Sequence, residues 1–171
     1  EYDALGRRVK RKVRTTGANT QTTVFALSGN QVVAEYDTTN PSMPAKKYAY
    51  GSYVDEPVML IVVTGTPTTP IETSYYYHQN NNFNVLALTD STGSVIERYS
   101  YQAYGLPTIY NAVGTVIASS SVGNEYLFTG RRWDSKQSNY YYRARFQRPT
   151  LNQFLIRDPA EYIDSSSMYQ Y

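Results

Sequence analysis

The stretch DSTGSVIERYSYQAYG, residues 90–105, indicates the fold class of this chain. It opens on a turn sequence that suits a short hairpin and continues as β-branched and aromatic residues up to a second glycine. The pattern returns as NAVGTVIASSS at residues 111–121, so that Gly93 and Gly114 lie 21 residues apart, and more weakly as SGNQVVAEYD at residues 28–37. A repeat of about 20 residues, in which a tight glycine turn joins two strands, predicts stacked hairpins that pair edge to edge.

A second block recurs beside the first. YDALGRR at residues 2–8 and YQAYGLP at residues 101–107 match at Tyr, Ala and Gly, while KYAYGSY at residues 47–53 keeps the tyrosine pair and the glycine. Apolar residues seldom recur at helical spacing, whereas alternation and short apolar runs are frequent. The sequence therefore predicts an all-β fold of antiparallel β-hairpin repeats, in a continuous twisted strip or a partial β-spiral shell.

Turn-forming residues bound twelve candidate strands. They are residues 7–15, 22–27, 31–37, 46–53, 58–63, 71–78, 85–90, 95–101, 108–110, 115–120, 126–129 and 139–145. Residues 38–44 and 64–73 are rich in Thr and Pro, and we expect exposed loops there because proline cannot supply a full ladder of backbone donors.

Composition limits the classes of protein. The 171 residues suit one domain, and 16 cations against 14 anions are too balanced to indicate a partner class. Without cysteine there is neither a disulfide framework nor a thiolate metal cluster, and no apolar run approaches the ~20 residues that span a bilayer. The 19 tyrosines favour strands with stacked cross-strand rings. The start without Met and the end inside a patterned segment suggest a section of a longer protein.

The blocks YDALGRR, RYSYQAYG and, above all, YLFTGRRWDSKQSNYYYRARFQRPTLNQFLIRDP at residues 126–159 resemble the RHS or YD-repeat family. The last block resembles the RHS-repeat-associated core. The motif residues are Tyr2, Asp3, Gly6, Arg7, Gly93, Tyr99, Tyr101, Gly105, Gly130, Arg131, Tyr140, Tyr141, Tyr142, Arg143, Arg145, Asp158 and Pro159. The resemblance implies one β domain over residues 1–171, with repeat hairpins in 1–125 and a core-like segment in 126–171, in a secreted or cell-surface protein.

Larger members of that family form cell-surface scaffolding or a hollow shell around a toxin. Their cores carry Tyr-Tyr-Asp-Pro where this chain has Phe146 to Pro149, so one turn carboxylate is missing. In many relatives a later Asp-Pro-Gly-Leu block supports aspartate-dependent self-cleavage. Arg157 and Asp158 match the first element of that self-cleaving core, but the partner block is absent from this chain.

Candidate reactive groups have simpler structural interpretations. His78 is the single histidine, and a strand-end role suits it better than metal binding. The hydroxyls of residues 119–121 lack a nucleophile-elbow pattern. Asp134 with Asp158, or Asp158 with Asp164, can act as an acid and base pair only if the fold brings them together, and turn aspartates are the alternative. We therefore expect no catalytic, cofactor-binding or metal-binding residues, and no cofactor.

Two segments carry both a binding and a structural interpretation. RRVKRKVR at residues 7–14 holds six cations that can bind phosphate or acidic polymers, or that protect an edge strand from unwanted pairing. The tyrosines and arginines of residues 140–145 can stack bases or sugars, or form a core strand with its arginines paired to carboxylates. The structural interpretation is preferred in both cases.

From these features the sequence predicts a non-catalytic structural module that builds an extracellular wall or filament by edge-to-edge strand self-association. The predicted partner is another copy, with cell-surface carbohydrate or protein as a further possibility, without specific nucleic acid and without membrane insertion. The alternatives are a toxin-encapsulating RHS shell, whose self-cleavage lies outside this chain, and a module that binds carbohydrate or another surface ligand.

Overall fold

The structure is a computed structural model that describes residues 1–14, 20–159 and 167–171. Its regular elements are strands apart from two short 3₁₀ turns. The chain forms two compact units, Glu1–Tyr77 with Asp90–Thr92 and His78–Thr89 with Gly93–Tyr171. No helix in the described residues has the length and apolarity to cross a membrane.

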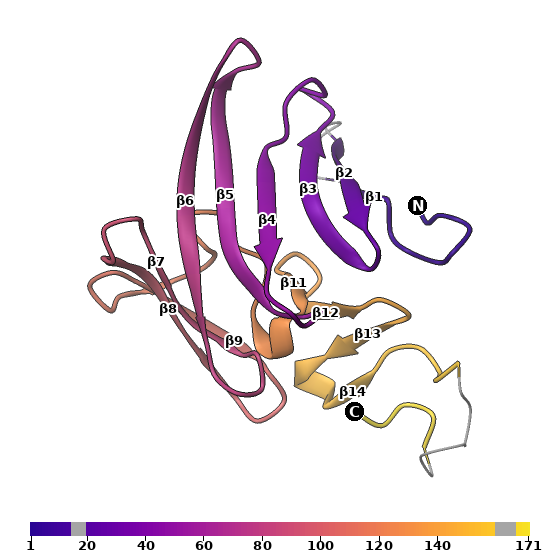
Figure 1. Cartoon of the computed structure of the whole chain (residues 1–171). Helices are drawn as coiled ribbons and strands as arrows, with labels where there is room; N and C mark the ends of the chain where they lie inside the picture. The colour runs from indigo at the N-terminus through magenta and orange to yellow at the C-terminus, as the bar shows by residue number, and fades with distance from the viewer. Residues whose placement is uncertain (15–19, 160–166) are drawn as a thin grey trace. The chain divides into compact units, whose positions relative to one another are not determined.

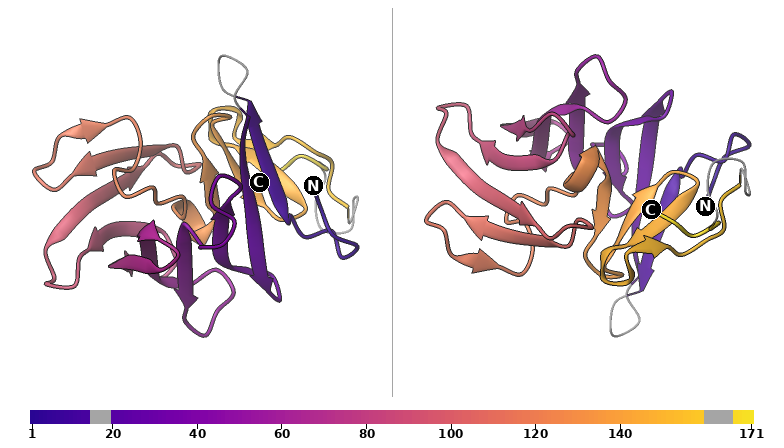
Figure 2. Two further views of the ribbon diagram at one scale, coloured as in Figure 1. Left: turned by 90° about the horizontal axis from the view of Figure 1, so that it is seen from above. Right: turned by 90° about the horizontal axis from the view of Figure 1, so that it is seen from below.

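The first unit is a meander of antiparallel strands, each hydrogen-bonded to the next in the chain (Figures 1 and 2). Its strands are β1 (Lys10–Arg14), β2 (Thr20–Ser28), β3 (Gln31–Asp37), β4 (Lys46–Tyr50), β5 (Pro57–Thr66) and β6 (Thr69–Gln79), the last of which runs on into the second unit. Phe25, Tyr48, Leu60 and Val63 are buried on this sheet. The predicted all-β, antiparallel hairpin fold is confirmed.

The second unit contains two groups of strands. β7 (Val85–Thr89), β8 (Val95–Tyr101), β9 (Pro107–Asn111) and β10 (Val116–Ile117) pair in sequence order. After the 3₁₀ turn η1 (Phe128–Gly130), β11 (Arg132–Asp134), β12 (Asn139–Tyr142), β13 (Arg145–Arg148) and β14 (Gln153–Phe154) form a separate four-stranded sheet, with the 3₁₀ turn η2 (Pro149–Leu151) before β14. The last four strands therefore do not extend the sheet that β7 to β10 form.

The recurring Tyr-Ala-Gly block folds as one type of turn. In the first copy Gly6 N donates to Asp3 O, and Asp3 N donates to Arg7 O. In the second copy Gly105 N donates to Gln102 O, and Gln102 N donates to Leu106 O. Both glycines have a positive φ, which a residue with a Cβ seldom adopts. The two blocks that are similar in sequence therefore form the same type of turn.

Three predicted segments differ from the structure. Residues 126–129 were expected as a strand, but φ of +51° at Thr129 and +65° at Gly130 bends the chain into η1. Residues 139–145 were expected as one strand, yet they form β12, a turn and the start of β13, because Arg143 has a φ of +61°. The expected loop at residues 64–73 is instead the tip of the β5–β6 hairpin.

Some other boundaries agree with the sequence, whereas β1, β4 and β10 are shorter than predicted and β5 is longer. β3 and β8 have the predicted limits, and residues 38–44 contain no strand. Residue 15, the predicted end of the first strand, lies outside the described residues. β11 and β14 have no counterpart among the predicted strands, since runs of three and two residues carry no periodic signal.

The four-stranded sheet is fixed within its unit by side chains that bind the turn between β8 and β9. The fully buried Tyr140 donates its hydroxyl to Gly105 O at 2.8 Å. The Gln147 side chain, also fully buried, donates to Tyr104 O at 3.0 Å. Phe128 packs between these elements, with its ring 5.5 Å from Tyr101 and 6.2 Å from Tyr140. The turn between β8 and β9 therefore holds the core-like segment in position within this unit.

Candidate functional site

The basic segment forms β1, the first strand of the first unit, and its cations divide between the two faces. Lys10, Lys12 and Arg14 occupy alternate positions and so point to the same face, about 7 Å apart. Their partners on β2 are Val24, Thr22 and Thr20, which carry no charge. The side chain of Lys12 is 57% exposed, and Arg14 is also exposed. These three side chains, the β1 cation row, present a positive line to solvent.

Glu1 neutralises part of this row. Its carboxylate lies 2.9 Å from the Nζ atoms of both Lys10 and Lys12. Hydrogen bonds from Lys12 and then Lys10 lower the pKa of the Glu1 carboxyl to about 2. Arg14 has no ion-pair partner among the described residues. The row therefore carries a net positive charge at neutral pH.

The remaining cations of the segment have structural contacts. Arg7 pairs with Asp3 at 2.7 Å and donates to Gly29 O at 2.8 Å. Hydrogen bonds from the Arg7 backbone and then its side chain hold the pKa of the Asp3 carboxyl below its usual value. Arg8 places its guanidinium 5.2 Å from the centre of the Phe25 ring. These contacts fix the Tyr2–Arg7 motif, whereas the β1 cation row faces solvent.

The tyrosine and arginine segment at residues 140–145 lies mainly in packed structure. Tyr141 packs on Phe146 with ring centres 5.4 Å apart, and the Tyr142 hydroxyl bonds Thr129 Oγ1 and the Tyr171 hydroxyl. Burial raises the pKa of the Tyr140 and Tyr142 hydroxyls. The rings do not form an exposed stacking row, which agrees with the structural interpretation.

Arginines brace the same segment. Arg145 pairs with Asp158 at 2.5 Å and lies 3.7 Å from the centre of the Phe154 ring. Arg131 lies 4.7 Å from the centre of the Tyr142 ring. A pairing of these arginines with a carboxylate is what the interpretation as a core strand predicted. Arg143 occupies the turn before β13, and Pro159 follows Asp158 at the surface.

The other candidate residues occupy separate local structures. Asp134 accepts hydrogen bonds from the backbones of Lys136 and Gln137, as a turn aspartate does, and Asp164 lies outside the described residues. His78 Nε2 is 3.0 Å from Thr89 Oγ1. In the described part of the chain, no three His, Asp or Glu side chains are grouped to hold a metal ion.

One buried carboxylate belongs to no motif of the sequence. Glu97 on β8 is fully buried and accepts hydrogen bonds from the Tyr99 hydroxyl and from both the backbone N–H and the hydroxyl of Ser121. Asn124 in turn donates to the Tyr99 oxygen at 3.1 Å. Burial, followed by the charge of Glu97, raises the pKa of the Tyr99 hydroxyl. Ser121 therefore has a structural role as a hydrogen-bond donor to Glu97. The network holds the segment after β10 in place.

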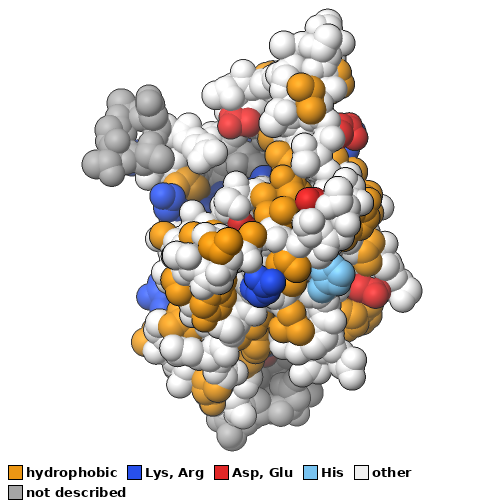
Figure 3. Space-filling view, turned by 90° about the vertical axis from the view of Figure 1, so that its left-hand side faces the viewer, with side chains coloured by type: hydrophobic (Ala, Val, Ile, Leu, Met, Phe, Trp, Pro, Cys, Tyr) orange, Lys and Arg blue, Asp and Glu red, His pale blue; other side chains and the backbone are white. Residues whose placement is uncertain are grey.

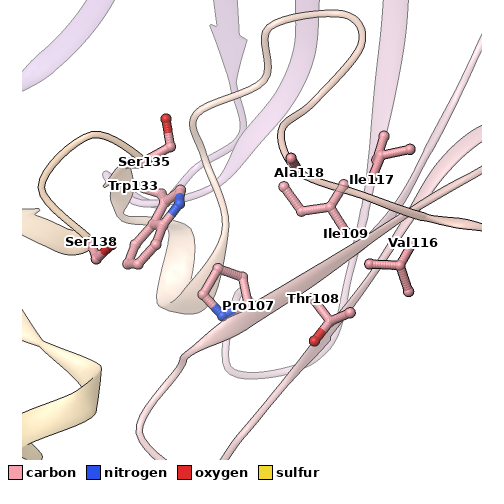
Figure 4. Close-up of a pocket in the computed structure, with 9 residues that line it drawn as sticks. All are labelled: Pro107, Thr108, Ile109, Val116, Ile117, Ala118, Trp133, Ser135 and Ser138. Atoms are coloured by element: carbon pink, nitrogen blue, oxygen red, sulfur yellow. The ribbon is translucent and has the colours of Figure 1, made fainter.

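A pocket of about 310 Å³ lies in the second unit (Figure 4). One wall is formed by residues of β9 and β10, and the other by the Trp133 indole with Ser135 and Ser138 from the turn after β11. The residues that line the pocket are Pro107, Thr108, Ile109, Val116, Ile117, Ala118, Trp133, Ser135 and Ser138. None of the nine is charged. The single tryptophan is a signal that could have pointed to this pocket, but no sequence pattern indicates the opposite wall.

Solved structures of other proteins share this fold. A TcdB2-TccC3 crystal structure matches 99% of this chain and 8% of its own with a TM-score of 0.63 and 18% identity. A Tc holotoxin pore structure from Photorhabdus luminescens matches 99% of this chain and 9% of its own, with a TM-score of 0.55 and 16% identity. These likenesses show a shared fold.

Curated relatives give a more particular match. The tRNA(Glu)-specific nuclease WapA of Bacillus subtilis subsp. natto strain BEST195 is 30% identical over 170 residues, and the tRNA nuclease WapA of Bacillus subtilis strain 168 is 29% identical. Each match covers 99% of this chain, which spans 6% of the length of those relatives. No protein-family model matches the chain. The chain is thus similar, along almost its whole length, to a short section of these nucleases, and the expected secreted or cell-surface location is consistent with such relatives only at a coarse level.

These relatives correct the functional expectations. Because they are named tRNA nucleases, the prediction of a non-catalytic module that builds a wall or filament by self-association is wrong, as is the expectation that the protein is not an enzyme. The expectation of no specific nucleic-acid partner is wrong for the same reason. The repeats in the sequence led to the prediction of self-association. The few residues that a nuclease site requires do not change the amino-acid composition.

Proposed function

We propose that the protein to which this chain belongs is a toxin that cleaves tRNA. The observation that carries the proposal is the similarity to three WapA tRNA nucleases along 99% of the chain. Since the chain spans 6% of those relatives, the proposed activity is that of the whole protein. One solved neighbour that shares the fold is a Tc holotoxin pore, which supports the same class.

Within that toxin, we propose that residues 1–171 are one RHS/YD-repeat domain, with repeat hairpins in 1–125 and an RHS-repeat-associated core in 126–171. The Asp3–Arg7 pair in the first motif turn and the Arg145–Asp158 pair in the core-like segment support this assignment. So does Tyr140, which binds the glycine of a repeat turn. The motif residues thus have defined structural roles in both segments.

The β1 cation row is the proposed contact with the tRNA backbone. Phosphate contacts supply much of the affinity of a protein for nucleic acid, and they need cations that are exposed and not fully paired. Lys12 and Arg14 are exposed, and among the described residues Glu1 is the carboxylate that pairs with the row. The face seen in Figure 3, by comparison, is covered mainly by uncharged and hydrophobic side chains with scattered charges.

The test of the activity is to incubate the natural full-length protein with total tRNA and to resolve the products on a denaturing gel. Discrete tRNA fragments are expected. Intact tRNA under conditions in which a WapA nuclease cuts would contradict the proposal. The 171-residue chain, assayed in parallel, shows whether the cleaving residues lie within it.

The test of the contact is a triple K10Q/K12Q/R14Q variant, compared with a control K136Q/R98Q/R157Q that removes three exposed cations elsewhere. Three lost phosphate contacts should lower the slope of log affinity against log salt by about 2 for single-stranded RNA. The control should keep the original slope. Equal slopes for the two variants would contradict the proposal that β1 contacts the RNA.

A further inference from the structure

The pocket of the second unit has walls that suit a flat, uncharged ring. Ile109 and Val116 stand on one side and the Trp133 indole on the other, with Pro107 at the base of the same strand, β9 (Figure 4). The volume of about 310 Å³ is at the lower end for small-ligand sites. Because no charged side chain lines it, a phosphate or a carboxylate gains no ion pair inside.

Three polar groups line the pocket and make no hydrogen bond to the described residues: the Trp133 indole N–H and the hydroxyls of Ser135 and Ser138, two residues that are exposed to solvent. Trp133 is only 9% exposed, and its ring is fixed against Tyr140 with centres 4.8 Å apart. The nitrogen-bearing edge of the indole is turned toward Ile109 and Ala118 across the pocket (Figure 4). An indole N–H can only donate, so the pocket is prepared for a ligand with a hydrogen-bond acceptor on its edge.

A nucleobase has this chemistry. It is planar and apolar on both faces, and its edges carry carbonyl and ring-nitrogen acceptors. Enzymes that hold a single base place it between apolar or aromatic side chains and bind its edge with hydrogen bonds. Proteins that recognise RNA by sequence bind unpaired bases of loops and ends in this way.

We propose that this pocket binds one nucleobase, supplied by an unpaired position of tRNA. The inference rests on the proposed function for its choice of RNA as the source of the base. The base lies between the aliphatic wall and the tryptophan, and the Trp133 N–H with a serine hydroxyl donates to its acceptors. The sugar and phosphate remain outside the pocket, so the absence of charged residues from its lining does not oppose binding.

Trp133 is the single tryptophan of the chain, so its fluorescence reports on the pocket alone. The 171-residue chain is titrated separately with adenosine, guanosine, cytidine and uridine, and then with tRNA. Nucleosides lack phosphate and therefore avoid the β1 cation row. We expect a saturable change in Trp133 emission with at least one nucleoside and with tRNA. No change with any of them would overturn the proposal.

Two exposed valines of the β9–β10 hairpin give a matched pair of variants. Val116 lines the pocket and is 62% exposed, whereas Val113 is 85% exposed and is not among the pocket residues. V116D should weaken nucleoside binding about tenfold or more, because a carboxylate at the wall repels the acceptor edge and must lose water on binding. V113D should retain the original affinity. Equal effects of the two changes would contradict the pocket as the site.

The outcomes separate this inference from the proposed function. A nucleoside response together with a full-length protein that leaves tRNA intact keeps the pocket and ends the tRNA proposal. Cleavage of tRNA without any Trp133 response ends the pocket proposal alone. A response to apolar peptides but not to nucleosides would make the pocket a protein-docking site and overturn the inference.

Discussion

At the scale of single residues, the second unit depends on a carboxylate that no motif contains. Glu97 is fully buried, and its partners are the neutral groups of Tyr99 and Ser121. Burying a carboxylate is unfavourable unless its oxygens accept hydrogen bonds, and here both oxygens do. The network therefore holds the segment after β10 in one conformation, and that segment leads to η1 and the four-stranded sheet.

We expect E97A to lower the free energy of unfolding by about 3 kcal/mol, since the Tyr99 hydroxyl and the Ser121 N–H lose their acceptor inside the protein. Urea unfolding followed by circular dichroism measures the change. Y99F removes one of the three donors and should cost only about 1 kcal/mol. Similar losses in the two variants would argue against a shared network around Glu97.

Glu1 sets the charge of the β1 cation row, so E1Q should strengthen binding of single-stranded RNA at neutral pH. The pKa of Glu1 is lowered by Lys12 and Lys10 to about 2. Its ion pairs are therefore complete above the ordinary pKa of a glutamate and are lost only as the pH falls through about 2. Filter binding at low salt measures the affinity. E72Q, which frees Lys47 on β4, is the control and should have a smaller effect.

At the scale of elements, the turn residues are the part of the sequence that best predicts the hairpins. The predicted hairpins formed because glycine is placed where the backbone needs a positive φ, and this requirement is local. The hairpin between β12 and β13 escaped prediction because Arg143 adopts a positive φ without being glycine. Packing of Tyr141 on Phe146 and of Arg145 on Phe154 stabilises that turn, and both contacts form only in the folded chain.

Alanine substitutions at Gly105 and Gly114 distinguish the cost of backbone strain from the cost of steric overlap, because both glycines have a φ of +87°. A Cβ at Gly114 meets no atom within 4 Å, so G114A should cost about 1–2 kcal/mol from strain alone. A Cβ at Gly105 would lie 2.5 Å from Phe128 Cδ1, so G105A should lose clearly more stability in the same urea assay. Equal losses would show that Phe128 moves aside without cost.

At the scale of the whole molecule, tyrosine burial links stability to alkaline pH. Desolvation raises the pKa of the hydroxyls of four tyrosines, Tyr99, Tyr101, Tyr140 and Tyr142. An unfolded tyrosine ionises near pH 10, so their contribution to stability is complete below that pH and is lost as the pH rises above it. Most other tyrosines are at least partly exposed.

We therefore expect absorbance at 295 nm to rise in two stages during an alkaline titration. The buried four form the later stage, because burial raises the pKa of their hydroxyls, and they ionise together with the loss of the β-sheet circular dichroism signal. Y99F and Y140F should each reduce the amplitude of the second stage. A single stage that leaves the circular dichroism unchanged would contradict the burial of these hydroxyls.

The sequence by itself determined the β class, the hairpin order and the positions of the main turns. Each of these depends on short-range chemistry: side chains that alternate between two faces, and glycines that permit a positive φ. Its motifs also predicted a resemblance to the RHS family. The functional expectation failed because a repeat pattern describes how a chain pairs and not what the protein acts on.

Tertiary structure alone decided which cations of β1 share a face with Glu1, and which tyrosines are buried. It also brought Trp133 opposite Ile109 and Val116, and Tyr140 against Gly105, 35 positions apart in the chain. Such contacts join residues whose sequence separation exceeds any local pattern, and they form only when packing selects one arrangement of the strands. The pocket and the buried network therefore appear in the folded chain and in no motif.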